Sequence, residues 1–245
     1  MGKIDDIQAY KEWTEYHRSL KRDKAADNLS PVERKKKLEK LEANVIEWIL
    51  FFFSEFAKYP FTKFHKKAIK RITTNMEWYE VLSWSRELAK STIVFMCMMY
   101  LVLTGKKKNV LLISNSHENA VRLLEPYKKA FESNSMLKAY YGDLREFGSW
   151  TADEFTLTTG ATFRAIGALE SPRGTRKDAV RPDTALVDDF DTDADCRNPD
   201  ILKKKWEWFE EALFPTRSIS EDLLVIFCGY LIALDFCVKR AGDIG

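Results

Sequence analysis

The chain has 245 residues, and its 39 Lys and Arg residues nearly balance 37 Asp and Glu residues, which gives a formal net charge of +2. Hydrophobic residues make up 45% of the chain and charged residues 31%, a composition typical of a globular protein and not of a disordered or fibrous one. The near-neutral charge excludes a uniformly basic nucleic-acid wrapper, although local basic patches remain possible.

The sequence predicts neither membrane insertion nor secretion. Its longest apolar run, residues 93–103, is shorter than the roughly 18 residues that a membrane-spanning helix needs. Residues 1–6 lack the apolar core of a signal peptide and the pattern of an acylation site. The four cysteines are widely spaced and the three histidines are scattered, which argues against a disulfide framework or a structural zinc site. We therefore expect a cytosolic protein without membrane contact.

The pattern up to about Met76 predicts helices. In the first of them, apolar residues recur at helical spacing from Ile4 to Leu20. Ser30, Pro31 and Glu33 predict the start of another helix, with Ser30 as the N-cap and Glu33 closing a capping box. We expect this second helix to run to about Lys58, because Pro60 ends it.

From Trp78 onward, short apolar strands alternate with amphipathic helices, which predicts an α/β fold with a mostly parallel sheet flanked by helices. The expected strands cover residues 78–83, 110–114, 155–158, 162–168, 184–187 and 223–228, and the expected helices cover residues 90–104, 118–132 and 201–213. Thr159 and Gly160 separate two alternating segments and predict an inserted β-hairpin.

The segment between the first strand and the next helix carries the residues of a phosphate-binding loop. It reads Trp84, Ser85, Arg86, Glu87, Leu88, Ala89, Lys90, Ser91, Thr92. Backbone N–H groups at a helix N-terminus attract phosphate oxygens, while a Lys supplies charge and a Ser supplies a magnesium ligand. The standard G-x-x-x-x-G-K-[ST] motif has glycine where this chain has Trp84 and Ala89. A polar turn that caps a buried helix is therefore the alternative.

A second half-motif lies about a hundred residues downstream, where an apolar strand ends in Asp188 and Asp189. An aspartate at such a strand end can hold magnesium, and a second carboxylate can orient the attacking water. Asp191, Asp193 and Asp195 continue the acidic run, so a solvated acidic loop is the alternative interpretation. Two half-motifs in this order favour a nucleotide site.

These motifs resemble those of the large terminase subunits of tailed bacteriophages and prophages. Residues 86–92 resemble the deviant Walker A motif of that family, in which an Arg opens the loop. Residues 167–176 and 181–183 resemble the stretch that leads into its Walker B strand, residues 61–65 its adenine-contacting region, and residues 223–229 its coupling motif. The resemblance covers the chain from about Tyr59 to its end. It implies a P-loop NTPase domain of the ASCE (RecA-like) type over residues 59–245, preceded by a helical N-terminal segment over residues 1–58.

The resemblance also implies an activity and assigns residues to it. ATP hydrolysis with Mg²⁺ would drive double-stranded DNA into a procapsid. Lys90 and the loop amides would hold the phosphates, Ser91 and Asp188 would hold Mg²⁺, Asp189 would position the water, and Arg86 would stabilise the developing charge. Phe64 and His65 would contact the adenine. Asp189 is one methylene shorter than the usual Glu, Asp191 is the second choice for that role, and Tyr230 stands where a small polar residue is common.

The implied assembly is a homo-oligomeric ring docked on a portal protein and loaded with DNA by a small terminase subunit, in the host cytoplasm. Alone, the domain is expected to be a monomer. The family usually continues into an RNase H-type nuclease domain, whereas this chain stops at Gly245, so we expect no nuclease activity. The alternatives are a helicase-like nucleic-acid-dependent ATPase and a non-catalytic nucleotide- or DNA-binding assembly module.

Two groups of cations have open roles. Residues 57–76 contain no Asp or Glu. Their cations are Lys58, Lys63, Lys66, Lys67, Lys70 and Arg71. They could contact DNA phosphates or form a solvated helix face. Arg173 and Arg176 could act on a neighbouring site or on DNA, or could pair with Glu170 or Asp178.

Overall fold

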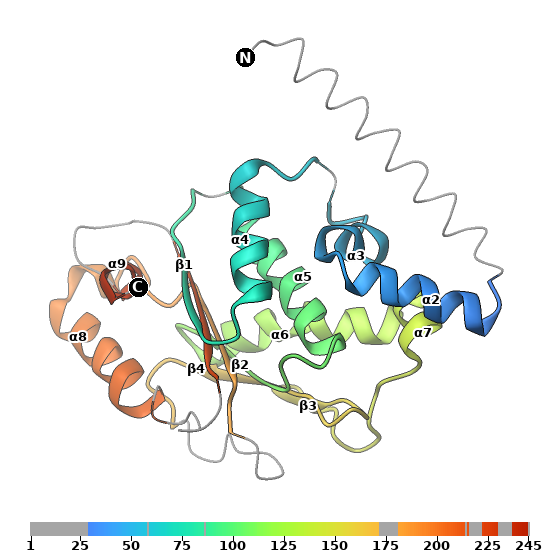
Figure 1. Cartoon of the computed structure of the whole chain (residues 1–245). Coiled ribbons are helices and arrows are strands. Elements are labelled where there is room, and N and C mark those ends of the chain that lie inside the picture. Colours follow the sequence, from blue (N-terminus) through green and yellow to red (C-terminus); the bar gives the residue numbers. More distant parts are fainter. Residues whose placement is uncertain are drawn as a thin grey trace, which may run out of the picture.

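A central β-sheet with helices on both faces organises the described part of the chain (Figure 1). The computed structural model describes residues 29–57, 59–85, 87–171, 181–213, 215, 222–229 and 237–244. The fold is α/β with a mostly parallel six-stranded sheet, which confirms the predicted fold class at this level. The helix predicted from Ile4 to Leu20 lies outside the described residues.

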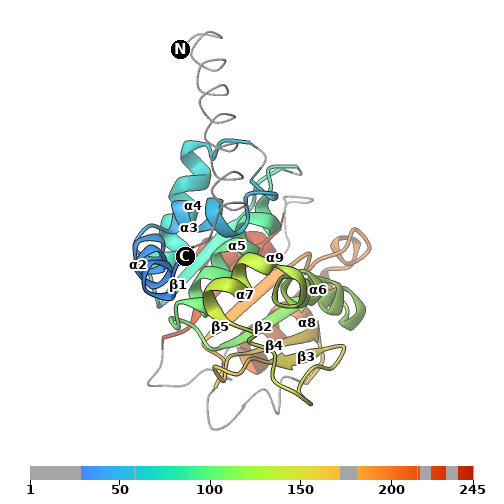
Figure 2. The same cartoon turned by 90° about the vertical axis from the view of Figure 1, so that its right-hand side faces the viewer.

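The strands lie in the order β1-β6-β5-β2-β4-β3, and all neighbours are parallel except β3 and β4. Their bounds are β1 Trp78–Leu82, β2 Asn109–Ser114, β3 Glu154–Thr156, β4 Thr162–Gly167, β5 Thr184–Asp188 and β6 Leu224–Cys228. All six predicted strands are present, and β3 pairs with β4 as the predicted hairpin at the margin of the sheet (Figure 2). Because β6 lies between β1 and β5, the loops after these three parallel strands meet at one edge.

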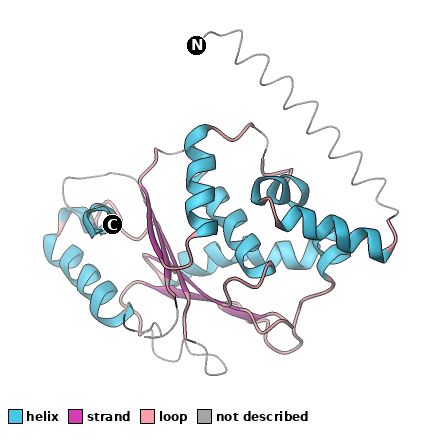
Figure 3. Ribbon diagram, viewed as in Figure 1, coloured by secondary structure: helices cyan, strands magenta, loops and turns pink. Residues whose placement is uncertain are grey.

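Side chains alternate between the two faces along each buried strand. On β6, Leu224 and Ile226 belong to one core cluster, whereas Val225 and Phe227 belong to the other. The helices that cover the two faces are α4 Lys63–Thr74, α5 Lys90–Leu103 and α6 His117–Ser133 on one side, and α8 Pro199–Glu207 and α9 Cys237–Ile244 on the other (Figure 3). Asp188 follows Leu186 by two residues and therefore faces α5.

The helix predicted from Ser30 onward begins as predicted but ends earlier than predicted. α2 (Pro31–Glu42) has Ser30 as its N-cap and a capping box with Glu33. The expectation of one helix to about Lys58 is wrong, because a second helix, α3 (Val45–Phe52), starts after a break. Asn44 causes the break: its side-chain oxygen accepts hydrogen bonds from the N–H groups of Ile46 and Glu47, which makes it the N-cap of α3.

Three other features differ from the sequence expectation. α7 (Ser135–Tyr141) follows α6 and was not predicted, and neither was α9. The helix expected over residues 201–213 is α-helical only to Glu207 and continues as a π-helix over Trp208–Leu213. Within the described ranges, none of the helices combines the length and apolar character required to cross a bilayer.

Candidate functional site

The loop between β1 and α5 turns into its helix through an unusual backbone conformation. Glu87 and Ala89 have φ angles of 68° and 56°, in the left-handed region that non-glycine residues seldom adopt. Ala89 occupies the N-cap position, and α5 begins at Lys90. The first N–H groups of a helix have no partner within it and carry the positive end of the helix dipole. The loop thus presents a helix end that attracts anions. Arg86, the residue predicted to stabilise the developing charge, lies outside the described residues.

Lys90 joins the ends of two neighbouring strands. Its Nζ donates a hydrogen bond to the Trp84 carbonyl at 3.0 Å and another to the carbonyl of Gly229, which follows β6. Both of these acceptors are neutral carbonyl oxygens. A carbonyl is a weaker partner for a cation than a phosphate oxygen, because the phosphate oxygen carries negative charge and adds Coulomb attraction.

Ser91 and Asp188 bring the two half-motifs into contact. Ser91 Oγ donates to Asp188 Oδ2 at 2.6 Å, although the residues are far apart in the sequence. Asp188 is only 8% exposed, and burial raises the pKa of its carboxyl group, while the bond from Ser91 acts in the opposite direction. The predicted magnesium ligands, Ser91 and Asp188, therefore lie side by side.

The oxygen atoms of Ser91 and Asp188 suit a magnesium ion that is also bound by the phosphates of a substrate. Mg²⁺ prefers oxygen ligands and is commonly bound through one or two carboxylates plus substrate phosphates. Within the described ranges, no group of three or more His, Cys, Asp or Glu side chains is arranged to hold a metal ion. A hydroxyl and a carboxylate at one point thus fit an ion that completes its shell with phosphate oxygens and water.

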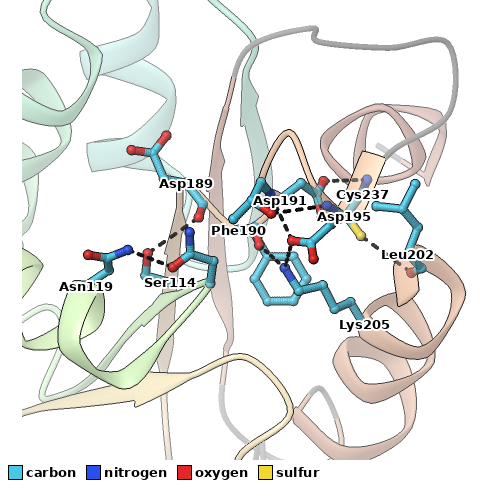
Figure 4. A network of polar contacts seen from close by, with 11 residues as sticks. Ser114, Asn119, Asp189, Phe190, Asp191, Asp195, Leu202, Lys205 and Cys237 are labelled. Carbon is cyan, nitrogen blue, oxygen red and sulfur yellow. Dashed lines mark hydrogen bonds and ion pairs between the residues drawn. The ribbon is translucent and has the colours of Figure 1, made fainter. Parts of the chain in front are cut away.

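Asp189 and Asp191 face different surroundings. Asp189 has a φ of 47°, and its carbonyl accepts a hydrogen bond from Asn115 N–H at 3.3 Å. Figure 4 shows its carboxylate on the side of Ser114 and Asn119, away from Asp191. Asp189 is therefore the better placed of the two predicted candidates for contact with a reacting water.

Asp191 instead holds the start of α9. Its Oδ2 accepts a hydrogen bond from Cys237 N–H at 2.7 Å (Figure 4). Nearby, the buried Lys205 donates to the Phe190 carbonyl at 2.5 Å and to Asp195 Oδ2 at 2.6 Å. Burial raises the pKa of Asp191. This cluster ties the loop after β5 to α8 and α9, and it explains part of the acidic run without a ligand.

A cavity of about 770 Å³ opens where the β1–α5 loop, the end of β5 and the start of α6 meet. Its described lining consists of Ser85, Glu87, Leu88, Ala89, Lys90, Ser91, Thr92, Ser114, Asn115, Asn119, Arg122, Leu123, Asp188, Asp189, Asp191, Thr192 and Asp193. The volume is within the range of small-molecule sites, about 300–1,000 Å³. Every described loop residue predicted to bind nucleotide lines it.

The residues contributed by β2 and α6 were missed by the sequence reasoning. Asn115 and Asn119 follow β2, and Asn119 Nδ2 donates to Asn115 Oδ1 at 2.7 Å. A signal was available: polar residues directly after a buried parallel strand lie at the edge where ligands bind in open α/β sheets. No Walker-type pattern marks them, so they looked like an ordinary helix start.

Phe64 and His65 lie beside the β1–α5 loop and are not among the cavity-lining residues. His65 Nδ1 accepts from Thr62 N–H at 3.3 Å, which leaves Nε2–H to donate to the Leu88 carbonyl at 3.1 Å. Burial lowers the pKa of His65, which favours this neutral form. The Phe64 ring packs edge-on against Trp84, with centroids 4.9 Å apart. These aromatic side chains support the loop from outside the cavity.

The other predicted residues fall into two groups. Arg173, Arg176 and Tyr230 lie outside the described residues. In α4, Lys63, Lys66, Lys67 and Lys70 are exposed, whereas Arg71 pairs with the buried Glu80. Of the described cations in this run, only Arg71 is therefore tied to β1 by an ion pair; the lysines form a basic outer face of α4.

No protein family model matches this chain, and no curated protein sequence is similar to it. The interpretation of the site therefore depends on its residues and geometry, namely a cation and a hydroxyl at the start of α5 facing a buried aspartate at the end of β5.

Proposed function

We propose that the chain is a P-loop ATPase of the ASCE (RecA-like) type, the motor domain of a large terminase subunit, which hydrolyses ATP to translocate double-stranded DNA into a procapsid. One observation carries the nucleotide part of this proposal: the 2.6 Å contact between Ser91 and Asp188, next to Lys90 in the same cavity. The strand order supports it as well. β6 lies between β1, which precedes the loop, and β5, which ends in Asp188, so the loop and Asp188 meet at the same edge of the sheet. The DNA-packaging part depends on the sequence resemblance.

The residues suggest the following roles in hydrolysis. The amides at the start of α5 and the Lys90 ammonium bind the β- and γ-phosphates. Ser91 and Asp188 hold Mg²⁺, which when bound neutralises charge on the phosphate oxygens. Asp189 orients a water in line with the γ-phosphorus and accepts its proton. As the water oxygen forms its bond to phosphorus, the bond to the β–γ bridging oxygen breaks and ADP keeps the electron pair. Arg86 stabilises the charge that develops.

The remaining partners follow from the same proposal. Double-stranded DNA, a portal protein and a small terminase subunit are the expected partners, and a ring of copies of this chain is the expected working assembly in the host cytoplasm. The exposed lysines of α4 are a candidate DNA contact, because each phosphate that they neutralise makes binding weaker as salt rises.

The decisive test is phosphate release by the wild type and by Lys90→Ala, with Mg²⁺, at high protein concentration and with and without double-stranded DNA. We expect hydrolysis to fall by about 100-fold or more in the variant, because the transferred phosphoryl group loses its principal described cation. Lys108→Ala is the matched control and should behave as the wild type, because Lys108 is an exposed lysine just before β2 and outside the cavity lining.

Other outcomes separate the rival functions. Equal background rates in the wild type and Lys90→Ala, with nucleotide binding retained, would indicate a non-catalytic nucleotide-binding module. Strand separation by the purified chain, without a capsid partner, would favour a helicase-like ATPase over a packaging motor.

A further inference from the structure

The cavity contains an excess of acidic side chains. Glu87, Asp188, Asp189, Asp191 and Asp193 line it, whereas Lys90 and Arg122 are the basic residues among its described lining. A bound triphosphate adds further negative charge, and magnesium offsets only part of it. Any cation that reaches the terminal phosphate thus has a strong electrostatic effect in a partly enclosed site.

Arg122 lines the cavity on the side that α6 contributes. It is in α6, which follows β2, and β2 pairs directly with β5, the strand that ends in Asp188. The Asn115 N–H bond to the Asp189 carbonyl fixes the start of α6 beside the acidic pair. Asn119 lines the cavity and lies near Asp189 in Figure 4. Arg122 is three residues after Asn119, so both project from the same face of α6.

The present partner of Arg122 holds it only weakly. Its Nη2 donates to Glu118 Oε1 at 2.5 Å, one helical turn away, and the two side chains are 66% and 76% exposed. An exposed pair of this kind contributes about 0.3–0.5 kcal/mol in helices. A phosphate group can accept two parallel hydrogen bonds from one guanidinium, which is a stronger arrangement.

We propose that Arg122 is a further catalytic residue, which leaves Glu118 and binds the γ-phosphate of ATP from the α6 side, opposite the β1–α5 loop. This inference rests on the proposed ATPase function. It assigns to α6 the recognition of the third phosphate, because Lys90 and the amides of α5 approach from the other wall. ADP lacks that phosphate, so Arg122 distinguishes ATP from ADP and stabilises charge during hydrolysis.

The test compares Arg122→Ala, Arg122→Lys and Glu118→Gln with Lys129→Ala, an exposed lysine on α6 outside the cavity lining. Steady-state hydrolysis gives kcat and KM, and fluorescence titration gives the affinities for ADP and for a non-hydrolysable ATP analogue. We expect Arg122→Ala to lower kcat by about 10- to 1,000-fold and to weaken binding of the analogue more than binding of ADP. Arg122→Lys should recover part of the loss, and Lys129→Ala should match the wild type.

Glu118→Gln separates a catalytic role from a structural one. If Arg122 serves the phosphate, removing the charge of Glu118, and with it the ion pair, leaves hydrolysis intact. If Glu118→Gln loses as much activity as Arg122→Ala, the ion pair is what matters and the inference is overturned. All variants should unfold at the wild-type temperature, because both side chains are largely exposed.

The outcomes also distinguish this inference from the proposed function. If Lys90→Ala is inactive but Arg122→Ala has the wild-type kcat and the wild-type preference between the two nucleotides, only the role of Arg122 is overturned. If the wild type binds neither nucleotide, both proposals fail. If the wild type binds nucleotide without hydrolysis, the catalytic role of Arg122 is overturned together with the ATPase proposal, and the ratio of the two affinities decides only whether Arg122 binds the third phosphate.

Discussion

At the scale of single residues, Ala89 departs most clearly from what its position favours. Its φ of 56° lies in the left-handed region, where a Cβ atom approaches the following carbonyl oxygen. The standard phosphate-loop motif has glycine at this position, for which the conformation carries no steric penalty. The β1–α5 loop therefore keeps its turn into α5 despite a local strain, and such strain is often found at functional sites.

Replacing Ala89 by glycine should relieve this strain. We expect Ala89→Gly to raise stability by about 0.5–1 kcal/mol, because the relief exceeds the added freedom of the unfolded chain. In a domain of this size that corresponds to about 1–4 °C in Tm, measured by circular dichroism. The control is Ala139→Gly, an exposed helical position in α7, which should lower Tm instead. A lower Tm for Ala89→Gly would contradict the strain argument.

At the scale of elements, α9 is held to the sheet by contacts at its first turn. Asp191 accepts the hydrogen bond from Cys237 N–H at 2.7 Å, and its other oxygen is buried with no hydrogen-bond partner among the described residues. Lys205 and Asp195 are the nearby charged groups, and they are bonded to each other at 2.6 Å. Asp191 thus caps a helix at the expense of burying a carboxylate.

This arrangement predicts an unusual pH dependence. Burial raises the pKa of Asp191 in the folded chain, so the stability it contributes is complete below its ordinary pKa and is lost as the pH rises through the folded pKa. Asp191→Asn keeps the acceptor but does not ionise. In urea unfolding, its stability advantage over the wild type should therefore grow as the pH rises from about 4 and then level off.

Asp191→Ala provides the matched comparison, because it removes the cap together with the charge. It should be about 1 kcal/mol less stable than Asp191→Asn at every pH. A difference between Asp191→Asn and the wild type that does not vary with pH would show that burial does not govern this carboxyl group.

The elements that sequence reasoning predicted well are those with a complete local signal. The capping box depends on Ser30 and Glu33, which are close in the sequence. The hairpin likewise depends on the alternation of residues on either side of Gly160. α9 lacked such a signal, because the acceptor for its first N–H group, Asp191, is remote in the sequence. The break at Asn44 was missed for a different reason: the charged residues before it and the apolar residues after it both favour a helix, so a single capping residue between them was overlooked.

At the scale of the whole molecule, the order of strands decides which parts of the sequence meet. The sequence paired Lys90 and Ser91 with Asp188 as a functional group, and the structure places Ser91 and Asp188 in contact. Asn119 could have been anticipated from its position after β2, but no local pattern pointed to Arg122, because the pairing of β2 with β5 brings α6 to the same cavity. Strand order depends on long-range packing, which a local pattern does not encode.

The same order connects the cavity to α9 through Gly229. Lys90 binds the Gly229 carbonyl, and a Cβ at Gly229 would lie 2.9 Å from the Val238 side chain of α9. The Gly229 backbone therefore packs closely against Val238, and a triphosphate that draws the Lys90 ammonium away would loosen this packing. We therefore expect a non-hydrolysable ATP analogue to speed labelling of the buried Cys237 thiol by a maleimide about tenfold, since local opening limits the reaction.

Peptide mapping by mass spectrometry would follow each thiol separately. The buried Cys97 of α5 should stay unlabelled, and the partly exposed Cys196 should label at the same rate with and without the analogue. In Lys90→Ala the effect of the analogue on Cys237 should disappear. Identical Cys237 rates in the wild type with and without the analogue would mean that Gly229 does not relay occupancy of the cavity to α9.

The bonds from Lys90 to the Trp84 and Gly229 carbonyls have a consequence for the affinity of the proposed nucleotide site. If a triphosphate binds there, its oxygens must replace these carbonyls as acceptors for the ammonium. The bonds given up offset part of the bonds gained, so the affinity is moderated. Both carbonyls remain in place to accept the side chain again when the product leaves, which favours its release.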